Sequence, residues 1–407
     1  MNKKILILII IIFTSLFISC NSSSVNLGNN RVKISSGQNN PSSPERLPLA
    51  TPSKSKQKPK LLLYSFIHPD YLKDTAEFWG TKTGFSGFMI SYVYDWHISP
   101  EKMETRTPKL KAMNDECRKY GIDKNFVKIS MAHFRDLDWA NEKQWKEILD
   151  HMRFAVKYAR EAGFVGIALD TEPYYRKDNS IWDWKNERYE GMKKSDVNDL
   201  VYKRGKELMS VIKEEFPESE FIIFPEGHYY YSYPAESTSD TKRIYNLWGS
   251  FFRGLCDAGL ESGIVLGTER TYHVTNKGLL EKRYYLVNKV MSDLCKESDY
   301  WNAKCSVAIG LAPLGKKFKD KSARYSYKGF ENQLEVSVKL CKRYVWIYGH
   351  GAAWWKLDDE NKYRKRGFAY WRPYYQILDC DPLINKYYKA TLDFFRPDDA
   401  VNGNIEN

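Results

Sequence analysis

The chain alternates eight times between a short apolar run and a longer stretch of helical periodicity, and this alternation limits its fold more than any other feature. The apolar runs cover residues 61–66, 87–92, 126–131, 164–169, 221–224, 263–266, 306–311 and 344–348. The helical stretches cover residues 71–79, 109–120, 145–162, 196–216, 245–258, 279–295, 332–342 and 374–388. Because parallel strands need helical crossovers, the pattern predicts an α/β fold with a parallel sheet, and eight units predict a (β/α)8 TIM barrel.

An open doubly wound sheet is the alternative arrangement of such units. Sheets of that kind usually carry a glycine-rich phosphate turn after a strand, and no such turn follows any apolar run here. We therefore predict one barrel domain over residues 61–395 and a flexible tail over residues 396–407. With 43% hydrophobic and 28% charged residues, the composition excludes a disordered or polytopic membrane chain.

The first 20 residues have the pattern of an export signal. Lys3 and Lys4 precede an apolar run over residues 5–18, which is short for a transmembrane helix, and Ser19 comes directly before Cys20. The segment resembles a bacterial lipoprotein signal. This resemblance implies that Cys20 is acylated, for example with palmitate, and that the protein is anchored to a membrane of the bacterial cell envelope, facing the periplasm or the exterior. An ordinary signal peptide with an incidental cysteine is the alternative.

Most of the positive charge lies ahead of the predicted barrel. The net charge is +12, and Lys3, Lys4 and the seven Lys or Arg against one Glu in residues 21–60 account for most of it. The barrel is therefore only mildly basic, and we expect no nucleic-acid partner. Residues 21–60 hold almost no large apolar side chains, so we expect a disordered tether. The oligomeric state stays open.

The cysteines do not predict a metal site. Beyond Cys20 the chain has six cysteines, none in a Cys-x-x-Cys pair or a Cys/His cluster: Cys117, Cys256, Cys295, Cys305, Cys341 and Cys380. We therefore expect no zinc site and no cofactor. Cys295 and Cys305 are the nearest pair in sequence, and an exported protein can hold a disulfide. A bridge between them and unpaired buried thiols both stay open.

Two carboxylates follow the fourth apolar run. Side chains alternate faces along a strand, and the bulky ones expected to face the helices are Val165, Ile167 and Leu169. The small Gly166 and Ala168 then face the crowded barrel interior. The same parity places Asp170 and Glu172 on the inner side at the mouth, roughly 6.5 Å apart along the strand. Two such groups tend to keep one proton, which a general acid requires. A turn-capping Asp and an ion-paired Glu are the structural alternative.

Two further carboxylates follow neighbouring strands. Glu269 comes after the sixth run with the same inward parity, and Glu226 comes after the fifth run, before a tyrosine cluster. Active sites of TIM barrels lie at these strand ends. The alternatives are an ion pair between Glu269 and Arg270, and a turn role for Glu226.

Aromatic residues near the same strand ends suggest a carbohydrate ligand. Residues 174–189 are long for a βα loop and include Trp182, and aromatic faces with polar edges commonly line sites for polyhydroxylated ligands. The residues expected to contact substrate are Tyr174, Trp184, Tyr230, Tyr272, His350 and Trp354. For Trp354, a role in closing the barrel core is an equal alternative.

Residues 164–172 resemble the fourth strand of the family 18 glycoside hydrolases, which ends in an Asp-x-Asp-x-Glu run. The matching residues are Gly166, Ile167, Leu169, Asp170 and Glu172, whereas Val165 and Ala168 differ from the acidic or amide residues of that family. The resemblance implies that Glu172 is the acid and Asp170 the carboxylate that orients a substrate acetamido group. More broadly, the chain resembles glycoside-hydrolase TIM barrels.

We therefore expect an exported, lipid-anchored glycoside hydrolase that acts on a polysaccharide or glycoconjugate. Glu172 is the expected acid, and Asp170, Glu269 or Glu226 the second carboxylate, which attacks the sugar or stabilises an oxocarbenium-like transition state. A catalytically silent, carbohydrate-binding barrel is the second hypothesis, favoured by Ala168 and by a seventh strand that ends without a carboxylate. A metal-dependent hydrolase is disfavoured because no paired histidines end a strand.

Overall fold

We describe the fold from a computed structural model, in which residues Lys56–Asn407 form one compact unit. The structure describes residues 58–91, 93–131, 137–172, 180–232, 245–297, 299–313, 326–349, 352–356, 359–360, 362–363, 375–376 and 383–396. The expectations for the export signal and Cys20, and for residues 21–57 of the tether, lie outside these residues.

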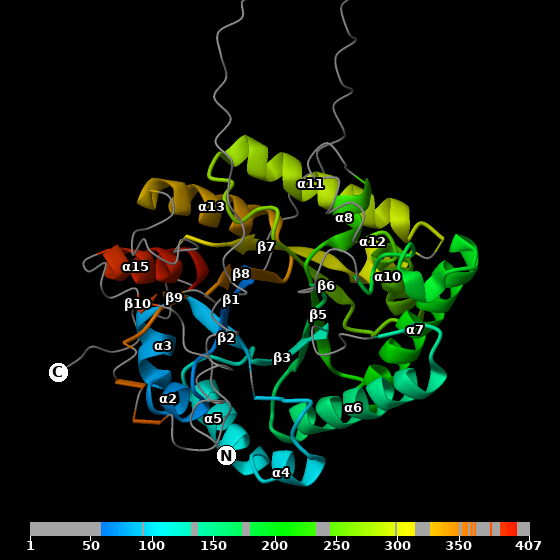
Figure 1. Cartoon of the computed structure of the whole chain (residues 1–407). Coiled ribbons are helices and arrows are strands. Elements are labelled where there is room, and N and C mark those ends of the chain that lie inside the picture. The colour runs from blue at the N-terminus through cyan, green and yellow to red at the C-terminus, as the bar shows by residue number, and fades with distance from the viewer. Residues whose placement is uncertain are drawn as a thin grey trace, which may run out of the picture. The chain divides into compact units, whose positions relative to one another are not determined.

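Eight parallel strands close into a barrel in chain order, as the alternation predicts. They are β1 (Lys60–Ser65), β2 (Phe85–Ile90), β3 (Phe126–Ser130), β4 (Gly166–Asp170), β5 (Glu220–Phe224), β6 (Ile264–Thr268), β7 (Ser306–Leu311) and β8 (Tyr344–Tyr348). The barrel closes where β1 pairs with β8, with Lys60 opposite Tyr344. Figure 1 shows the strands at the centre and the helices around them. The (β/α)8 fold is confirmed.

The helices follow the strands in the predicted order. The longer ones are α5 (Thr107–Lys119), α6 (Glu142–Glu161), α7 (Lys194–Glu215), α10 (Trp248–Ala258), α11 (Lys277–Leu294), α13 (Tyr327–Leu340) and α15 (Leu383–Phe395). The shorter ones are α2 (Pro69–Asp74), α3 (Ala76–Lys82), α4 (Pro100–Glu104), η3 (Glu187–Tyr189), α8 (Gly227–Ser232) and α12 (Tyr300–Lys304).

The predicted last helix, over residues 374–388, is wrong in its bounds. Tyr375 and Gln376 form strand β10, which pairs with β9 (Ala352–Ala353), and α15 continues to Phe395. Pro382 directly precedes α15 in the sequence. Proline is tolerated at the start of a helix but not inside one, so a helix through this position is disfavoured. Arg396, assigned to the flexible tail, is half-buried and donates a hydrogen bond to the Phe85 carbonyl at 2.9 Å.

Side-chain alternation divides the core into two layers. Ile167 and Leu169 belong to the outer layer between strands and helices. Ala168 belongs to the inner layer, which fills the barrel. Val165 packs on the inner layer, against expectation. It precedes the first residue of β4, so the alternation of that strand does not extend to it.

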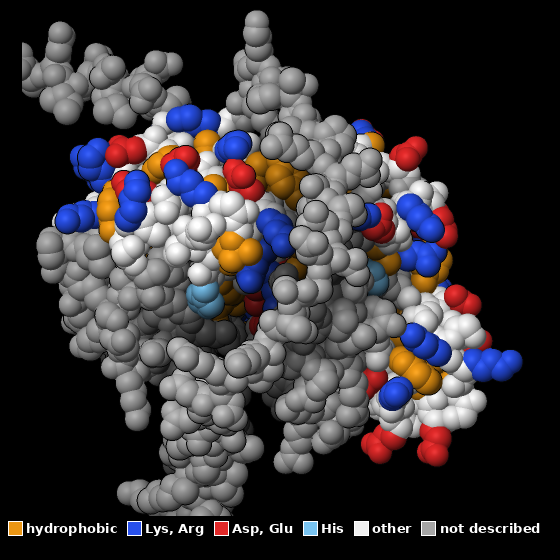
Figure 2. All heavy atoms as spheres, turned by 90° about the horizontal axis from the view of Figure 1, so that it is seen from above, with side chains coloured by type: hydrophobic (Ala, Val, Ile, Leu, Met, Phe, Trp, Pro, Cys, Tyr) orange, Lys and Arg blue, Asp and Glu red, His pale blue; other side chains and the backbone are white. Residues whose placement is uncertain are grey.

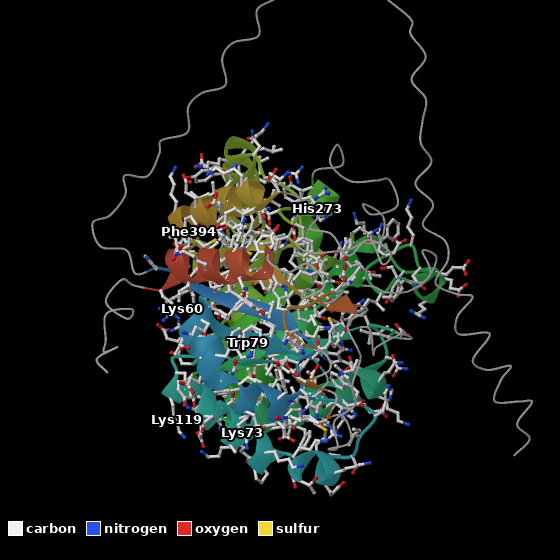
Figure 3. The ribbon with its side chains drawn as sticks, turned by 90° about the vertical axis from the view of Figure 1, so that its left-hand side faces the viewer. Lys60, Lys73, Trp79, Lys119, His273 and Phe394 are labelled. Atoms are coloured by element: carbon white, nitrogen blue, oxygen red, sulfur yellow. The ribbon has the colours of Figure 1, made fainter. Side chains whose placement is uncertain are left out.

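The two ends of the barrel differ in chemistry. Near the start of the strands, the Glu220 carboxylate accepts hydrogen bonds from Tyr344 at 2.7 Å and Lys124 at 2.8 Å and pairs with Arg343. Burial opposes its ionisation, but these partners outweigh burial and lower the pKa of Glu220. In Figure 3, Lys60 at the start of β1 lies on the left and His273, which follows β6, lies to its right. The strand ends, where the predicted carboxylates lie, are therefore remote from this cluster.

The surface carries charges of both signs. The face in Figure 2 shows Lys and Arg side chains interspersed with Asp and Glu over its described part. Exposed ion pairs on the helices include Lys146–Asp150 on α6 and Lys289–Asp293 on α11. Among the described helices, none is long and apolar enough to cross a bilayer.

Candidate active site

Asp170, the last residue of β4, is held by an ion pair inside the barrel. Its Oδ2 lies 2.8 Å from Nζ of Lys128 on β3, and Asp170 is 1% exposed. Lys128 lies opposite Ala168 in the register of β3 and β4, so its side chain points into the barrel as that of Ala168 does. Burial acts to lower the pKa of Lys128, but the charges of Asp170 and Tyr64 outweigh it and raise that pKa. Lys128 is therefore an ammonium cation and not a free amine nucleophile.

Glu172 lies at the mouth, just beyond the end of β4. Its backbone N–H donates to Oδ1 of Asp170 at 3.0 Å, which forms a turn at the strand end. The Glu172 residue is partly exposed. Its negative charge contributes to raised pKa values of Glu269, Tyr272 and Tyr348, so it faces the same space as residues from β6 and β8.

Glu226 joins the ends of β5 and β6. It is fully buried and accepts a hydrogen bond from the Thr268 hydroxyl. It also accepts backbone hydrogen bonds from Glu269 at 2.8 Å and Arg270 at 2.9 Å. Burial raises the pKa of the Glu226 carboxyl, although these donors act against the rise. Its position fixes the turn that carries Glu269.

Glu269 directly follows β6 and is partly exposed as a residue, and the environment of its carboxyl group favours the protonated form. Burial is the largest cause of its raised pKa, and three neighbouring carboxylates add to it: Glu172, Glu226 and Asp170. The Tyr272 hydroxyl donates to Oε1 of Glu269 at 3.1 Å. Carboxylates that follow β4, β5 and β6 therefore influence one another electrostatically.

Aromatic rings form the floor beneath these carboxylates. Tyr348 lies with its ring centroid 5.3 Å from that of Tyr272 and 5.6 Å from that of Tyr64. Trp346 packs 5.4 Å from Tyr272 and 5.2 Å from Phe224. Tyr348 is partly exposed, whereas the other four rings are buried. Tyr348 is thus the ring of this group that can meet a ligand.

Two glycines make room for Trp346. A Cβ on Gly267 would lie 3.2 Å from Nε1 of Trp346, and one on Gly310 would lie 2.9 Å from its Cε2 and 2.2 Å from the Thr268 carbonyl oxygen. The inward position of Gly310 on β7 therefore excludes a side chain, and that of Gly267 on β6 leaves little room for one. The Trp346 indole fills the interior that they leave open.

Two tryptophans expected near the ligand are core residues. Trp354 is fully buried and packs against Tyr387 and Tyr388 of α15, with centroid distances of 6.2 Å. Its expected role in stacking on a sugar is wrong, because no ring face is open. Trp182 is also fully buried and donates to the Thr171 carbonyl at 2.8 Å.

The other expected substrate contacts have different positions. Trp184 is partly exposed, and Lys185 and Lys194 lie 5.9 and 6.0 Å from its ring centroid. Tyr272 is 6% exposed and lies beside Glu269. Tyr174, His350 and the side chain of Tyr230 lie outside the described residues.

The sequence reasoning missed Lys128, Tyr64 and Tyr348. A lone lysine in the apolar run Phe126-Val127-Lys128-Ile129 was a usable signal, because the parity of that strand turns it inward. Tyr64 is the next-to-last residue of β1 and Tyr348 is the last of β8, and neither carries a comparable signal in the sequence. Among the described residues, no group of three or more His, Cys, Asp or Glu side chains is arranged to hold a metal ion.

No protein family and no curated protein sequence matches the chain. Solved structures with a similar fold include a GH18 chitinase from Pseudoalteromonas aurantia, with 9% identity, a TM-score of 0.42, and coverage of 71% of this chain and 93% of that chain. A GH5-4 broad-specificity endoglucanase from an uncultured bacterium has 11% identity, a TM-score of 0.46, and coverage of 81% and 85%. A D-psicose 3-epimerase has 9% identity, a TM-score of 0.45, and coverage of 83% and 99%. The likeness concerns the barrel alone.

Proposed function

We propose that this protein is a glycoside hydrolase that uses Glu172 and Glu269 as its reacting pair. The observation that carries the proposal is the electrostatic interaction between these two partly exposed residues, which follow β4 and β6 at the mouth of the barrel. Glycosidases use two such groups on either side of the scissile bond. Tyr348 supplies a ring face beside them.

In this proposal Glu269 carries the proton of the pair, and its raised pKa supports this role. Glu269 then protonates the glycosidic oxygen, and the ionised Glu172 stabilises the positive charge that develops on the sugar or attacks its anomeric carbon. This allocation reverses the sequence-based one, in which Glu172 is the acid.

Asp170 and Glu226 are positioning residues in this proposal. One Asp170 oxygen faces Lys128 and the other accepts the Glu172 N–H. Glu226 is buried and accepts hydrogen bonds from the turn that carries Glu269. These contacts leave Asp170 and Glu226 poorly placed to touch a substrate, but they fix the two groups that do.

A panel of polysaccharides and glycoconjugates tests the proposal. Product release by the wild type, lost in Glu172→Gln and in Glu269→Gln, is expected. Glu261→Gln is the matched control, because Glu261 is exposed and precedes the start of β6, away from the mouth. Full activity of Glu172→Gln on a cleaved glycan removes Glu172 from the chemistry. Binding without product release by the wild type supports the silent carbohydrate-binding barrel instead.

We also propose that the protein is anchored to the cell envelope through acylated Cys20, on the basis of the N-terminal pattern of Lys3, Lys4 and residues 5–18. Expression in a bacterium fed radiolabelled palmitate tests this. The wild type is expected to take up label and to sediment with membranes, and Cys20→Ala is expected to do neither. Equal labelling of the two proteins contradicts the anchor.

A further inference from the structure

Three cysteine thiols meet behind β6, away from the carboxylates. Cys256 lies in the last turn of α10, Cys295 directly follows α11, and Cys305 directly precedes β7. They are 2%, 4% and 5% exposed. Hydrogen bonds with Cys295 and Cys305, and then burial, raise the pKa of the Cys256 thiol well above its ordinary value. The cluster is therefore shielded from solvent, and the Cys256 thiol favours its protonated form in the reduced chain.

Within this cluster, Cys256 and Cys295 are the two residues whose sulfur atoms contact each other directly at a known distance. Cys295 Sγ donates to Cys256 Sγ over 3.5 Å. A disulfide bond measures about 2.0 Å, so the two sulfurs must approach by roughly 1.5 Å. Cys305 Sγ has another partner, since it accepts the Ile264 N–H at 3.4 Å at the start of β6.

We propose that Cys256 and Cys295 form a disulfide when the protein folds under oxidising conditions. The oxidant is a small-molecule disulfide. The Cys256 thiolate attacks one of its sulfurs and expels one thiolate, and the Cys295 thiolate then attacks the Cys256 sulfur and expels the second. Two protein thiols lose two electrons and two protons, and the reagent becomes two thiols.

Because the two thiols are buried in the folded protein, we expect the disulfide to form while the chain is still folding. Before α10 and α11 pack, the reagent can reach the thiols, whereas the folded protein covers them. The pair spans 39 residues that include β6 and Glu269. A bridge there joins the C-terminal ends of α10 and α11 on either side of the strand that positions Glu269, and it stabilises the fold by restricting the unfolded chain.

The sequence allows a direct test by peptide mapping. Trypsin places Cys256 in residues 254–270, Cys295 in residues 290–296 and Cys305 in a peptide that begins at residue 305. The full chain is refolded from urea in oxidised and reduced glutathione, alkylated, digested without reduction and analysed by mass spectrometry. The expected product links residues 254–270 to residues 290–296 and disappears after reduction. Three alkylated thiols, or a link through Cys305, overturn the proposal.

Single serine variants distinguish a Cys256–Cys295 disulfide from one that involves Cys305. Cys295→Ser is expected to lose the link, whereas Cys305→Ser and the matched control Cys341→Ser are expected to keep it. The oxidised wild type is expected to melt about 2–5 °C above its reduced form, and Cys256→Ser is expected to show no such difference. An equal melting temperature of the oxidised and reduced wild type contradicts a stabilising bridge. These results are independent of any glycan hydrolysis.

Discussion

At the scale of single residues, Lys128 and Glu269 define the electrostatics of the barrel mouth. Lys128 neutralises the buried Asp170 through a 2.8 Å contact. Within the part of the chain that the structure describes, no cation pairs with Glu269, and three carboxylates help to raise its pKa. Asp170 thus lies against a cation, whereas the surroundings of Glu269 favour its protonated form. A general acid needs surroundings like those of Glu269, which favour the protonated carboxyl group.

The raised pKa of Glu269 predicts that Glu269→Gln stabilises the fold at neutral pH while it removes activity. The folded state binds a proton at Glu269 more tightly than the unfolded chain does, so the wild type loses stability as pH rises from the ordinary Glu pKa through the raised one. At pH 7 the melting temperature of the variant should exceed that of the wild type by about 2–4 °C.

The comparison at acidic pH provides the control for this prediction. At pH 4 and below, Glu269 is protonated in the folded and unfolded chains, so the difference in melting temperature should vanish. Glu261→Gln should show no gain at pH 7, because Lys304 lowers the pKa of Glu261. A Glu269→Gln variant that is no more stable than wild type at pH 7 contradicts the proton assignment.

The ion pair between Lys128 and Asp170 predicts a second effect on the stability of the fold. Lys128→Met removes the cation that contacts the buried Asp170 carboxylate and should destabilise the fold by about 3–5 kcal/mol. Adding Asp170→Asn should recover a large part of that loss, and urea unfolding of the two variants measures it. Lys146→Met, which breaks an exposed pair with Asp150, should change stability by less than about 1 kcal/mol. Equal effects of Lys128→Met and Lys146→Met exclude a buried charge pair.

At the scale of elements, β6, β7 and β8 depend on each other through the Trp346 indole. Trp346 of β8 lies over Gly267 of β6 and Gly310 of β7. Small residues on two strands therefore accommodate one large residue on a third, which is how a crowded barrel interior reaches full packing. The aromatic floor of the proposed site rests on this arrangement.

Gly310→Ala should disrupt this packing. The new methyl group would meet the Thr268 carbonyl oxygen at 2.2 Å, and backbone cannot move away as a side chain can. We expect a loss of about 3 kcal/mol or more, measured by urea unfolding. Gly278→Ala on α11 is the matched control, because nothing but the Asn276 side chain lies near its Cβ, at 3.6 Å. It should be neutral or slightly stabilising. A neutral Gly310→Ala would contradict the packing described.

At the scale of the whole molecule, the barrel could be predicted because eight alternating segments repeat one local pattern. Strand parity predicts carboxylates at the mouth, and the charge of Glu172 is one cause of the raised pKa of Glu269. Trp354 could not be assigned, because its burial depends on contact with Tyr387 and Tyr388, which lie more than thirty residues away on α15. The Cys256–Cys295 contact could likewise not be predicted, because the two residues lie 39 positions apart. The cysteines nearest in sequence are instead Cys295 and Cys305.

The central claim is that Glu172 and Glu269 act as one unit on a glycan. The most direct test is kcat/KM of wild type, Glu172→Gln, Glu269→Gln and the double variant on a cleaved glycan. Each single change should lower kcat/KM about 10²–10⁴-fold, and the double variant should be little worse than the weaker single variant. Full activity of either single variant, or a double loss equal to the product of the single losses, would contradict the claim.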